Sequence, residues 1–89
     1  MKVIFVCLGN ICRSPMAEAM FKDLVSSAEL SSQIQVDSAA TSTYELGSPP
    51  DRRTVNELAK HGLSATNMIA RQLNATDFLE ADYILVMDE

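Results

Sequence analysis

Metal-binding and basic residues are scarce in this 89-residue sequence. It contains one histidine and two cysteines, and Cys7 and Cys12 lie five positions apart. This is not a zinc-ligand pattern, so we expect no metal site and no cofactor. Twelve acidic residues outnumber seven basic ones, which gives a formal net charge of −5. That charge argues against nucleic acids and anionic membrane surfaces as partners.

Long hydrophobic runs are also absent. No segment approaches the roughly 18 consecutive apolar residues of a transmembrane helix, and the apolar run near the N-terminus is too short for a signal peptide. We therefore expect a soluble, cytoplasmic protein. Apolar residues nonetheless make up 47% of the sequence, which is enough for the core of one small domain over residues 1–89.

The N-terminal region changes its hydrophobic period once. Val3–Val6 is a continuous apolar run and predicts a strand buried on both faces, as in parallel sheets covered by helices. Ser14 is a favoured N-cap, and Pro15 suits the first helical position. Beyond them, apolar residues at helical spacing predict a helix with an apolar face made of Met16, Ala17, Met20, Phe21, Leu24, Val25 and Ala28. Residues 7–14 therefore form a loop between a buried strand and a helix N-terminus.

This loop has the chemistry of an anion site. The first N–H groups of a helix are unpaired, and the helix dipole places positive charge there. Gly9 and Asn10 both tolerate positive φ, so the chain can curl until successive N–H groups converge on one point. Arg13 adds a planar two-pronged donor that matches two phosphate oxygens. At such positions the pKa of a cysteine falls from about 8.5 to roughly 3.5–7.5, so Cys7 is expected to be a thiolate, with the Ser14 hydroxyl as its hydrogen-bond donor.

A thiolate at the floor of an oxyanion cradle indicates covalent catalysis. Cys7 would attack phosphorus and form a phosphocysteine, from which water releases phosphate. A cysteine that ends a buried strand is, by itself, usually a small core residue. The strand, the Gly9-Asn10 pair, the serine and the proline-led helix together favour the catalytic interpretation. No Gly-Lys-Ser/Thr sequence follows, so a Walker-type nucleotide loop is not indicated.

Short motifs follow one another along the chain. The first is Cys7-Leu8-Gly9-Asn10-Ile11-Cys12-Arg13-Ser14-Pro15, with Met16-Ala17-Glu18-Ala19 behind it. The later ones are Asp37-Ser38-Ala39-Ala40-Thr41, Pro49-Pro50-Asp51, Ala70-Arg71-Gln72-Leu73 and Ile84-Leu85-Val86-Met87-Asp88-Glu89. In this order they resemble the low-molecular-weight protein tyrosine phosphatases, whose C-x5-R signature lies at the N-terminus. The resemblance implies phosphotyrosine phosphatase activity in a flavodoxin-like α/β fold, a three-layer parallel sheet with helices on both faces.

The resemblance also implies roles for individual residues. Cys7 and Arg13 would be catalytic. The substrate-binding residues of the loop would be Leu8, Gly9, Asn10, Ile11, Cys12 and Ser14. Tyr44 is expected to be an aromatic wall beside the substrate ring, rather than an anchor that packs its own loop down. Ser38 is expected to hold Asn10 in its strained conformation.

Two further positions bear on this loop. Cys12 is either a loop residue that points into the core or a second thiol that captures oxidised Cys7 as a disulfide. Family members often carry a cysteine there, so the resemblance favours the second interpretation. Met68 stands where many members have a histidine, which removes one support for Asn10.

Local signals predict the elements that follow the first helix. Gln33–Asp37 alternates like an edge strand beside Val3–Val6. Residues 38–50 form a long loop, of a length that is typical of functional loops. Asp51 begins a helix that stops at Gly62, and its apolar face is made of Val55, Leu58 and Ala59.

The C-terminal part contains a short helix and a strand. Asn74 caps a helix through Glu80, with Asp77 in a capping-box relation. Tyr83–Met87 predicts another buried strand, and Asp88-Glu89 its exit. The resemblance implies a domain truncated after this late strand, because the family's general acid lies in a later Asp-Pro pair. The last strand would then expose an edge or face through which the chain self-associates.

Three alternatives stay open at this stage. Arsenate reductases share the C-x5-R loop but need further cysteines, and none follows Cys12. A regulatory module could recognise phosphotyrosine without turnover, and an α/β fragment could need a partner to fold. For the phosphatase, the expected partners are a phosphotyrosine protein or a small aryl phosphate, with phosphate or another oxyanion bound in the loop.

Overall fold

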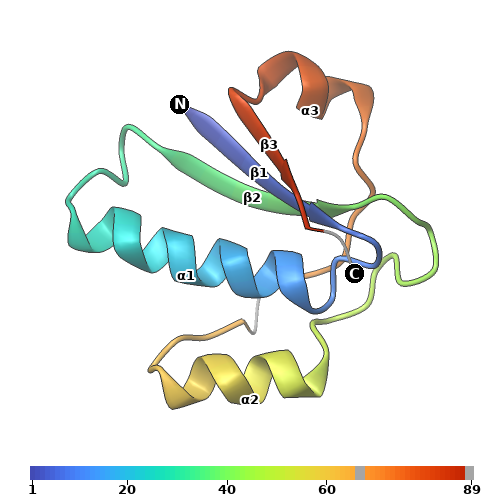
Figure 1. Cartoon of the computed structure of the whole chain (residues 1–89), viewed down its shortest axis with the longest axis horizontal. Coiled ribbons are helices and arrows are strands. Elements are labelled where there is room, and N and C mark those ends of the chain that lie inside the picture. The colour runs from blue at the N-terminus through green and yellow to red at the C-terminus, as the bar shows by residue number, and fades with distance from the viewer. Residues whose placement is uncertain (66–67, 88–89) are drawn as a thin grey trace.

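The computed structural model describes residues 1–65 and 68–87, and these residues form alternating strands and helices (Figure 1). In chain order the elements are β1 (Lys2–Cys7), α1 (Arg13–Ser27), β2 (Gln35–Ala40), α2 (Arg52–Lys60), α3 (Ala75–Glu80) and β3 (Tyr83–Val86). No helix in these two ranges is long and apolar enough to cross a membrane.

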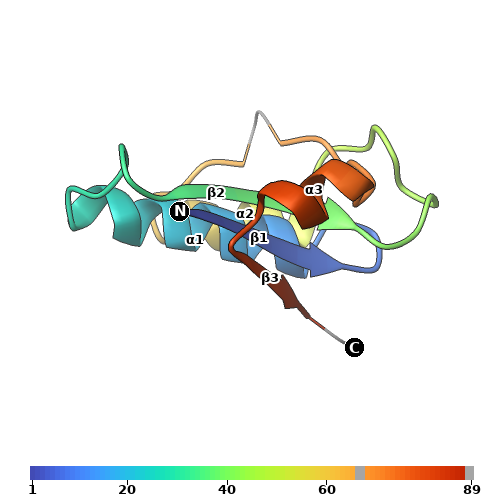
Figure 2. The ribbon, with the colours of Figure 1, turned by 90° about the horizontal axis from the view of Figure 1, so that it is seen from above.

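The strands form one parallel sheet in the order β2-β1-β3. The predicted α/β class, with Val3–Val6 in the central strand, is therefore confirmed. Because parallel partners end at the same edge of a sheet, the carboxyl ends of β1 and β2 lie side by side, with Cys7 opposite Ala40. The loop that follows β1 thus emerges next to the loop that follows β2 (Figures 1 and 2).

Alternate residues of β1 face two different layers. On one face Phe5 contacts Phe21 of α1, with ring centroids 5.8 Å apart in an edge-to-face arrangement. On the other face Ile4 and Val6 are fully buried. They pack in a cluster with Ala39, Ile84, Leu73 and Ala81. The last two residues flank α3, so helical segments cover both faces of the sheet, as expected.

Helix α2 packs on α1 through an apolar cluster in which Leu58 is only 1% exposed. It contacts Ala19 and Ala65 there. The predicted N-cap and stop of this helix are confirmed, since the Asp51 side chain accepts the Arg53 N–H at 2.8 Å and Gly62 has φ +75°. Ala59, predicted to lie on the apolar face, is exposed instead.

Leu58 gives a direct test of this packing. We expect Leu58→Ala to lower the free energy of unfolding by about 2–5 kcal/mol, because it removes buried methyl groups and leaves a cavity. Urea unfolding followed by circular dichroism measures the loss. Leu79→Ala is the matched control, since Leu79 is 85% exposed and its truncation should change stability by less than about 0.5 kcal/mol. Equal effects of the two substitutions would contradict the assigned core.

The start and outer face of α1 differ from the prediction. The helix begins at Arg13 with Cys12 at the N-cap position, and Ser14 makes no cap. The reason is that the Ser14 hydroxyl is turned toward Cys7. Of the predicted apolar face, Met20 and Leu24 are 46% and 63% exposed. Val25 is buried as predicted, and the other buried residues of the helix are Ser14, Pro15, Glu18 and Ala19.

The outer strands also differ in detail. β2 runs through Ala40, so the predicted loop from residue 38 begins later, and its first three positions pair with β1. The capping box of Asn74 and Asp77 is present at the start of α3. β3 was predicted to be buried, but three of its four side chains are exposed because the strand pairs only with β1 among the described residues. Asp88-Glu89 lie outside the described residues.

Candidate active site

The loop after β1 curls back over the end of its own strand. Asn10 takes the left-handed conformation, with φ 56°, and is only 4% exposed. Its N–H donates to Cys7 Sγ at 3.3 Å. The loop therefore closes on the sulfur at its start. Gly9 does not have the predicted positive φ. A Cβ there would lie 3.4 Å from the Glu45 side chain, an ordinary van der Waals contact.

Neighbouring segments hold the carbonyl groups of the loop. Thr41 N donates to Cys7 O at 3.0 Å, Ser42 N to Leu8 O at 3.0 Å and Asp51 N to Ile11 O at 2.7 Å. In a trans peptide the N–H points opposite to the carbonyl. The next N–H groups therefore turn away from these outer segments and toward the loop interior, which is the orientation that an anion cradle needs.

Cys7 is the chemically distinctive residue of the loop. Its Sγ lies 3.0 Å from Ser14 Oγ, and both groups are buried. Burial by itself raises the pKa of the thiol, but the Ser14 hydroxyl and the N–H groups of Ser14, Asn10 and Gly9 outweigh it, so that the pKa of Cys7 lies below its ordinary value. The sulfur is thus biased toward the thiolate, the nucleophilic form.

Cys7 and Arg13 share one surface cavity of about 640 Å³. Its lining residues are Cys7, Leu8, Gly9, Ile11, Cys12, Arg13, Ser42, Tyr44 and Glu45. The Arg13 side chain is exposed, and it makes no hydrogen bond or ion pair within residues 1–65 and 68–87. Tyr44 is 84% exposed at the cavity, so it is not packed down as a loop anchor. Glu45 and Ser42 also line the cavity, although neither was predicted as a site residue.

Asn10 and Ser14 were predicted to bind substrate, but they do not line the cavity. Both are buried beneath the loop, where their side chains bond to each other, Nδ2 to Oγ at 2.7 Å. Both residues contact the sulfur of Cys7, Asn10 through its N–H and Ser14 through its hydroxyl. Ser38 lies where it was expected relative to Asn10, with Asn10 Nδ2 donating to Ser38 Oγ at 2.9 Å. Cys12 is half-buried and lines the cavity instead of pointing into the core, and both thiols are free.

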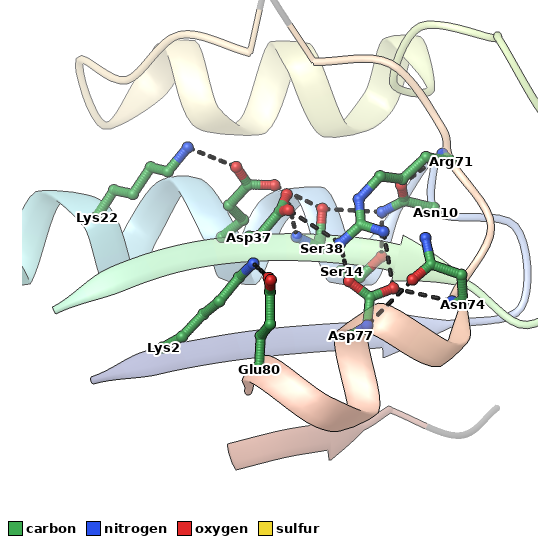
Figure 3. A network of polar contacts seen from close by, with 11 residues as sticks. Lys2, Asn10, Ser14, Lys22, Asp37, Ser38, Arg71, Asn74, Asp77 and Glu80 are labelled. Carbon is green, nitrogen blue, oxygen red and sulfur yellow. Dashed lines mark hydrogen bonds and ion pairs between the residues drawn. The ribbon is translucent and has the colours of Figure 1, made fainter. Parts of the chain in front are cut away.

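Arg71 was predicted only as part of the Ala70-Arg71-Gln72-Leu73 motif, but in the structure it connects the loop with α3 and β2. Its N–H donates to Asn10 Oδ1 at 3.2 Å. Its guanidinium binds both carboxylate oxygens of Asp77 at 2.8 and 3.0 Å, and Asp37 Oδ2 at 2.9 Å (Figure 3). Sequence could have indicated this site only through the capping box, which marks Asp77 as an inward-facing carboxylate.

The Arg71–Asp77 pair predicts a pH-dependent contribution to stability. Hydrogen bonds from Arg71 hold the pKa of Asp77 below its ordinary value, against the opposing effect of burial. A lowered folded-state pKa stabilises the fold above the unfolded value of about 3.9, and this contribution is lost as the pH falls through the folded value. Asp77→Asn should therefore cost about 1–3 kcal/mol at neutral pH and progressively less below about pH 4.

Urea unfolding across this pH range tests the prediction. Asp23→Asn is the matched control, because Asp23 is exposed and takes part in no ion pair among the described residues. A cost of Asp77→Asn that stays constant down to acid pH would show that the ionised pair is not its source.

Among the described residues no cluster of three or more histidine, cysteine or acidic side chains is placed to hold a metal ion. At the carboxyl end of the central strand β1, the structure gathers a cysteine of lowered pKa, an arginine and the backbone N–H groups of the loop.

Comparisons with known proteins agree with this arrangement. The chain is 58% identical over 87 residues to the low molecular weight phosphotyrosine protein phosphatase of Mus musculus, covering 98% of this chain and 54% of that protein. The crystal structure of YfkJ from Bacillus subtilis superimposes with a TM-score of 0.96 at 46% identity, over 99% of this chain and 55% of YfkJ. The structure of DARP, drosophila arginine phosphatase, gives 0.93 at 46% identity, over 99% and 55%.

This chain thus spans about half the length of the curated relatives that it matches. The family model for low molecular weight phosphotyrosine protein phosphatases matches residues 2–89. With the C-x5-R loop, the parallel sheet and these relatives in agreement, the chain belongs to the low molecular weight phosphotyrosine protein phosphatase family.

Proposed function

We propose that this chain is a protein tyrosine phosphatase that hydrolyses phosphotyrosine through a phosphocysteine on Cys7. The observation that carries the proposal is the shared cavity of Cys7 and Arg13, in which a thiol of lowered pKa stands beside an uncommitted guanidinium. The inward-turned N–H groups and Arg13 bind the three non-bridging phosphoryl oxygens. Charge that develops on these oxygens is then stabilised by donors that are already in place.

In this mechanism the Cys7 thiolate attacks phosphorus in line with the tyrosyl oxygen, and the S–P bond forms as the P–O bond breaks. Ser14 stabilises the sulfur as thiolate and again when water later displaces it from phosphorus. The sequence contains no Asp-Pro pair. We therefore assign protonation of the leaving oxygen to none of its residues, and a positioned acid is usually worth about 10²–10⁴-fold in rate.

The test is to mix the chain with an activated aryl phosphate, quench it in acid and locate the phosphoryl group by peptide mass mapping. We expect the adduct on Cys7 and not on Cys12, together with continued release of inorganic phosphate. An adduct without release would favour a phosphotyrosine-binding module. The absence of both the adduct and phosphate release would contradict the phosphatase proposal.

Arsenate reduction is not favoured by the family match, and no cysteine follows Cys12 to supply further thiols. The two free thiols fit a reducing compartment, so we place the protein in the cytoplasm.

We also propose weak self-association along β3, whose side chains Tyr83, Leu85 and Val86 are exposed.

Tyr44 is the proposed recognition element for the substrate ring. An aromatic pair is worth about 0.5–1.5 kcal/mol, so Tyr44→Ala should raise KM for an aryl phosphate by about threefold to tenfold. The inhibition constant of inorganic phosphate should stay unchanged, because the cradle is intact. Tyr44→Phe keeps the ring and should restore KM.

The preference for the aryl ester is tested by measuring turnover of a phosphotyrosine peptide and of a phosphoarginine peptide side by side. The phosphoarginine peptide is the matched alternative, because the similar protein DARP is described as an arginine phosphatase. The apolar side chains of Leu8 and Ile11 and the ring of Tyr44 in the cavity favour the aryl ester. Faster turnover of the phosphoarginine peptide would contradict the proposed substrate class.

A further inference from the structure

A buried carboxylate lies behind the catalytic loop and has no part in the mechanism above. Glu18, on the inner face of α1, is only 6% exposed. Its Oε1 accepts a hydrogen bond from Ser38 Oγ at 2.5 Å, and its Oε2 is bound by Lys22 Nζ at 2.5 Å. Glutamate is almost never buried without such partners, so the position of Glu18 calls for an explanation.

Glu18 lies at one end of a continuous chain of hydrogen bonds that reaches Cys7. Figure 3 shows the middle of this chain, from Ser38 through Asn10 to Ser14. Arg71 N–H donates to Asn10 Oδ1, which fixes the orientation of the amide. Both protons of Asn10 Nδ2 are then donated, one to Ser38 Oγ at 2.9 Å and one to Ser14 Oγ at 2.7 Å.

This arrangement leaves only one direction for each hydroxyl proton. A serine hydroxyl has a single proton, and a carboxylate only accepts. Ser38 therefore donates to Glu18. Ser14 accepts from Asn10, so its own proton is left for Cys7 Sγ, 3.0 Å away. Donation therefore runs outward from the Asn10 amide in both directions, through Ser14 to the sulfur and through Ser38 to the carboxylate.

We propose that Glu18 is a positioning residue for the nucleophile, which acts through Ser38 and Asn10 to keep the Ser14 hydroxyl pointed as a donor at the Cys7 thiolate. Without an acceptor at position 18, the Ser38 proton turns toward Asn10, and the amide loses one of its two acceptors. The Asn10–Ser14 bond is then no longer enforced, and Ser14 is free to direct its proton away from sulfur.

The charge of Glu18 and its hydrogen bond act on Cys7 with opposite signs. Through space, a nearby negative charge disfavours a thiolate, so removal of Glu18 alone would lower the thiol pKa. Through the relay, its removal raises that pKa. Other charged groups around this region are Lys22 and Asp23 of α1, Asp37 of β2 and Arg71. Lys22 neutralises Glu18 directly, so we expect the effect of the relay to be the larger one.

The test is the pH dependence of Cys7 alkylation by iodoacetamide in the whole chain, with peptide mapping to separate Cys7 from Cys12. In Glu18→Leu we expect a raised thiol pKa and, below it, alkylation slowed about threefold to tenfold. Glu18→Gln keeps an acceptor oxygen for Ser38 and removes only the charge, so the thiol pKa should not rise in this variant. Glu57→Leu is the matched control, because Glu57 is an exposed, ion-paired glutamate on α2.

Two outcomes would overturn the proposal. One is an unchanged or lowered thiol pKa in folded Glu18→Leu, which a purely structural or through-space role predicts. The other is a further rise of the thiol pKa when Glu18→Leu is added to Ser38→Ala, since without Ser38 only the through-space effect of the charge remains, and its loss lowers the pKa. If Glu18→Leu does not fold, Ser38→Ala decides by the sign of its shift, which must be upward.

The inference deepens the proposed function and rests on it for the nucleophilic role of Cys7. The two fail separately. Alkylation requires no phosphoryl transfer, so the relay can be established in a chain that shows no turnover. Conversely, a phosphoryl adduct on Cys7 combined with no effect of Glu18 substitution on the thiol pKa would support the proposed phosphatase and contradict the relay.

Discussion

Replacing Cys7 with serine is expected to abolish the phosphoenzyme and to lower turnover on the order of 10⁴–10⁶-fold, as loss of a nucleophile does elsewhere. A serine hydroxyl stays protonated at neutral pH, and the donors that favour a thiolate cannot lower its pKa far enough. The cradle should survive, because its carbonyls are held by Thr41, Ser42 and Asp51. Vanadate or phosphate affinity should thus change little.

Acid quench and mass mapping measure the first effect, and isothermal titration with vanadate measures the second. Together the two measurements distinguish loss of the nucleophile from loss of the anion-binding loop. Persistent labelling of Cys7→Ser protein would place the nucleophile elsewhere. If both vanadate binding and labelling are lost, the loop has collapsed. A melting curve compared with that of the unsubstituted chain checks this case.

Arg13→Lys should have the second largest effect, a loss of kcat/KM on the order of 10²–10³-fold, similar to removal of one oxyanion donor. Lysine keeps the charge but is a single point donor, whereas the planar guanidinium binds two oxygens at once. The loss should fall on both phosphate affinity and the chemical step, because the same oxygens gain charge in the transition state.

Steady-state kinetics and phosphate inhibition constants, measured side by side, test this expectation. Arg52→Lys on α2 is the control, since Arg52 is exposed and lies outside the cavity. Its substitution should leave both quantities unchanged. Full activity of Arg13→Lys would mean that charge alone is sufficient and that bidentate geometry is not used.

Sequence was most informative where local signals and chemistry coincide. The apolar run Val3–Val6, the loop that follows it and the capping box of Asn74 were predicted and are present. The contact between Ser38 and Asn10 was also expected, through the family resemblance, and it is present at 2.9 Å. These features depend on short stretches of chain or on a specific motif.

The errors lie where distant segments decide. Ser14 looks like an N-cap, yet its hydroxyl is turned toward Cys7, and the helix begins two residues earlier than predicted, at Arg13. Met20 and Leu24 follow the helical period but face outward. Glu18 is buried although it is charged, and one of its two partners, Ser38, lies 20 residues away. Helical periodicity cannot reveal such a partner.

The central place of β1 also bears on how the chain folds. On one side β1 pairs with β2 and on the other with β3, and the Lys2 N–H binds the Asp82 side chain 80 positions away. Closing so long a loop costs chain entropy before the contacts can form, so the pairing of β1 with β3 should form late in folding. We therefore expect the strand that presents the nucleophile to become fully ordered only once β3 has docked.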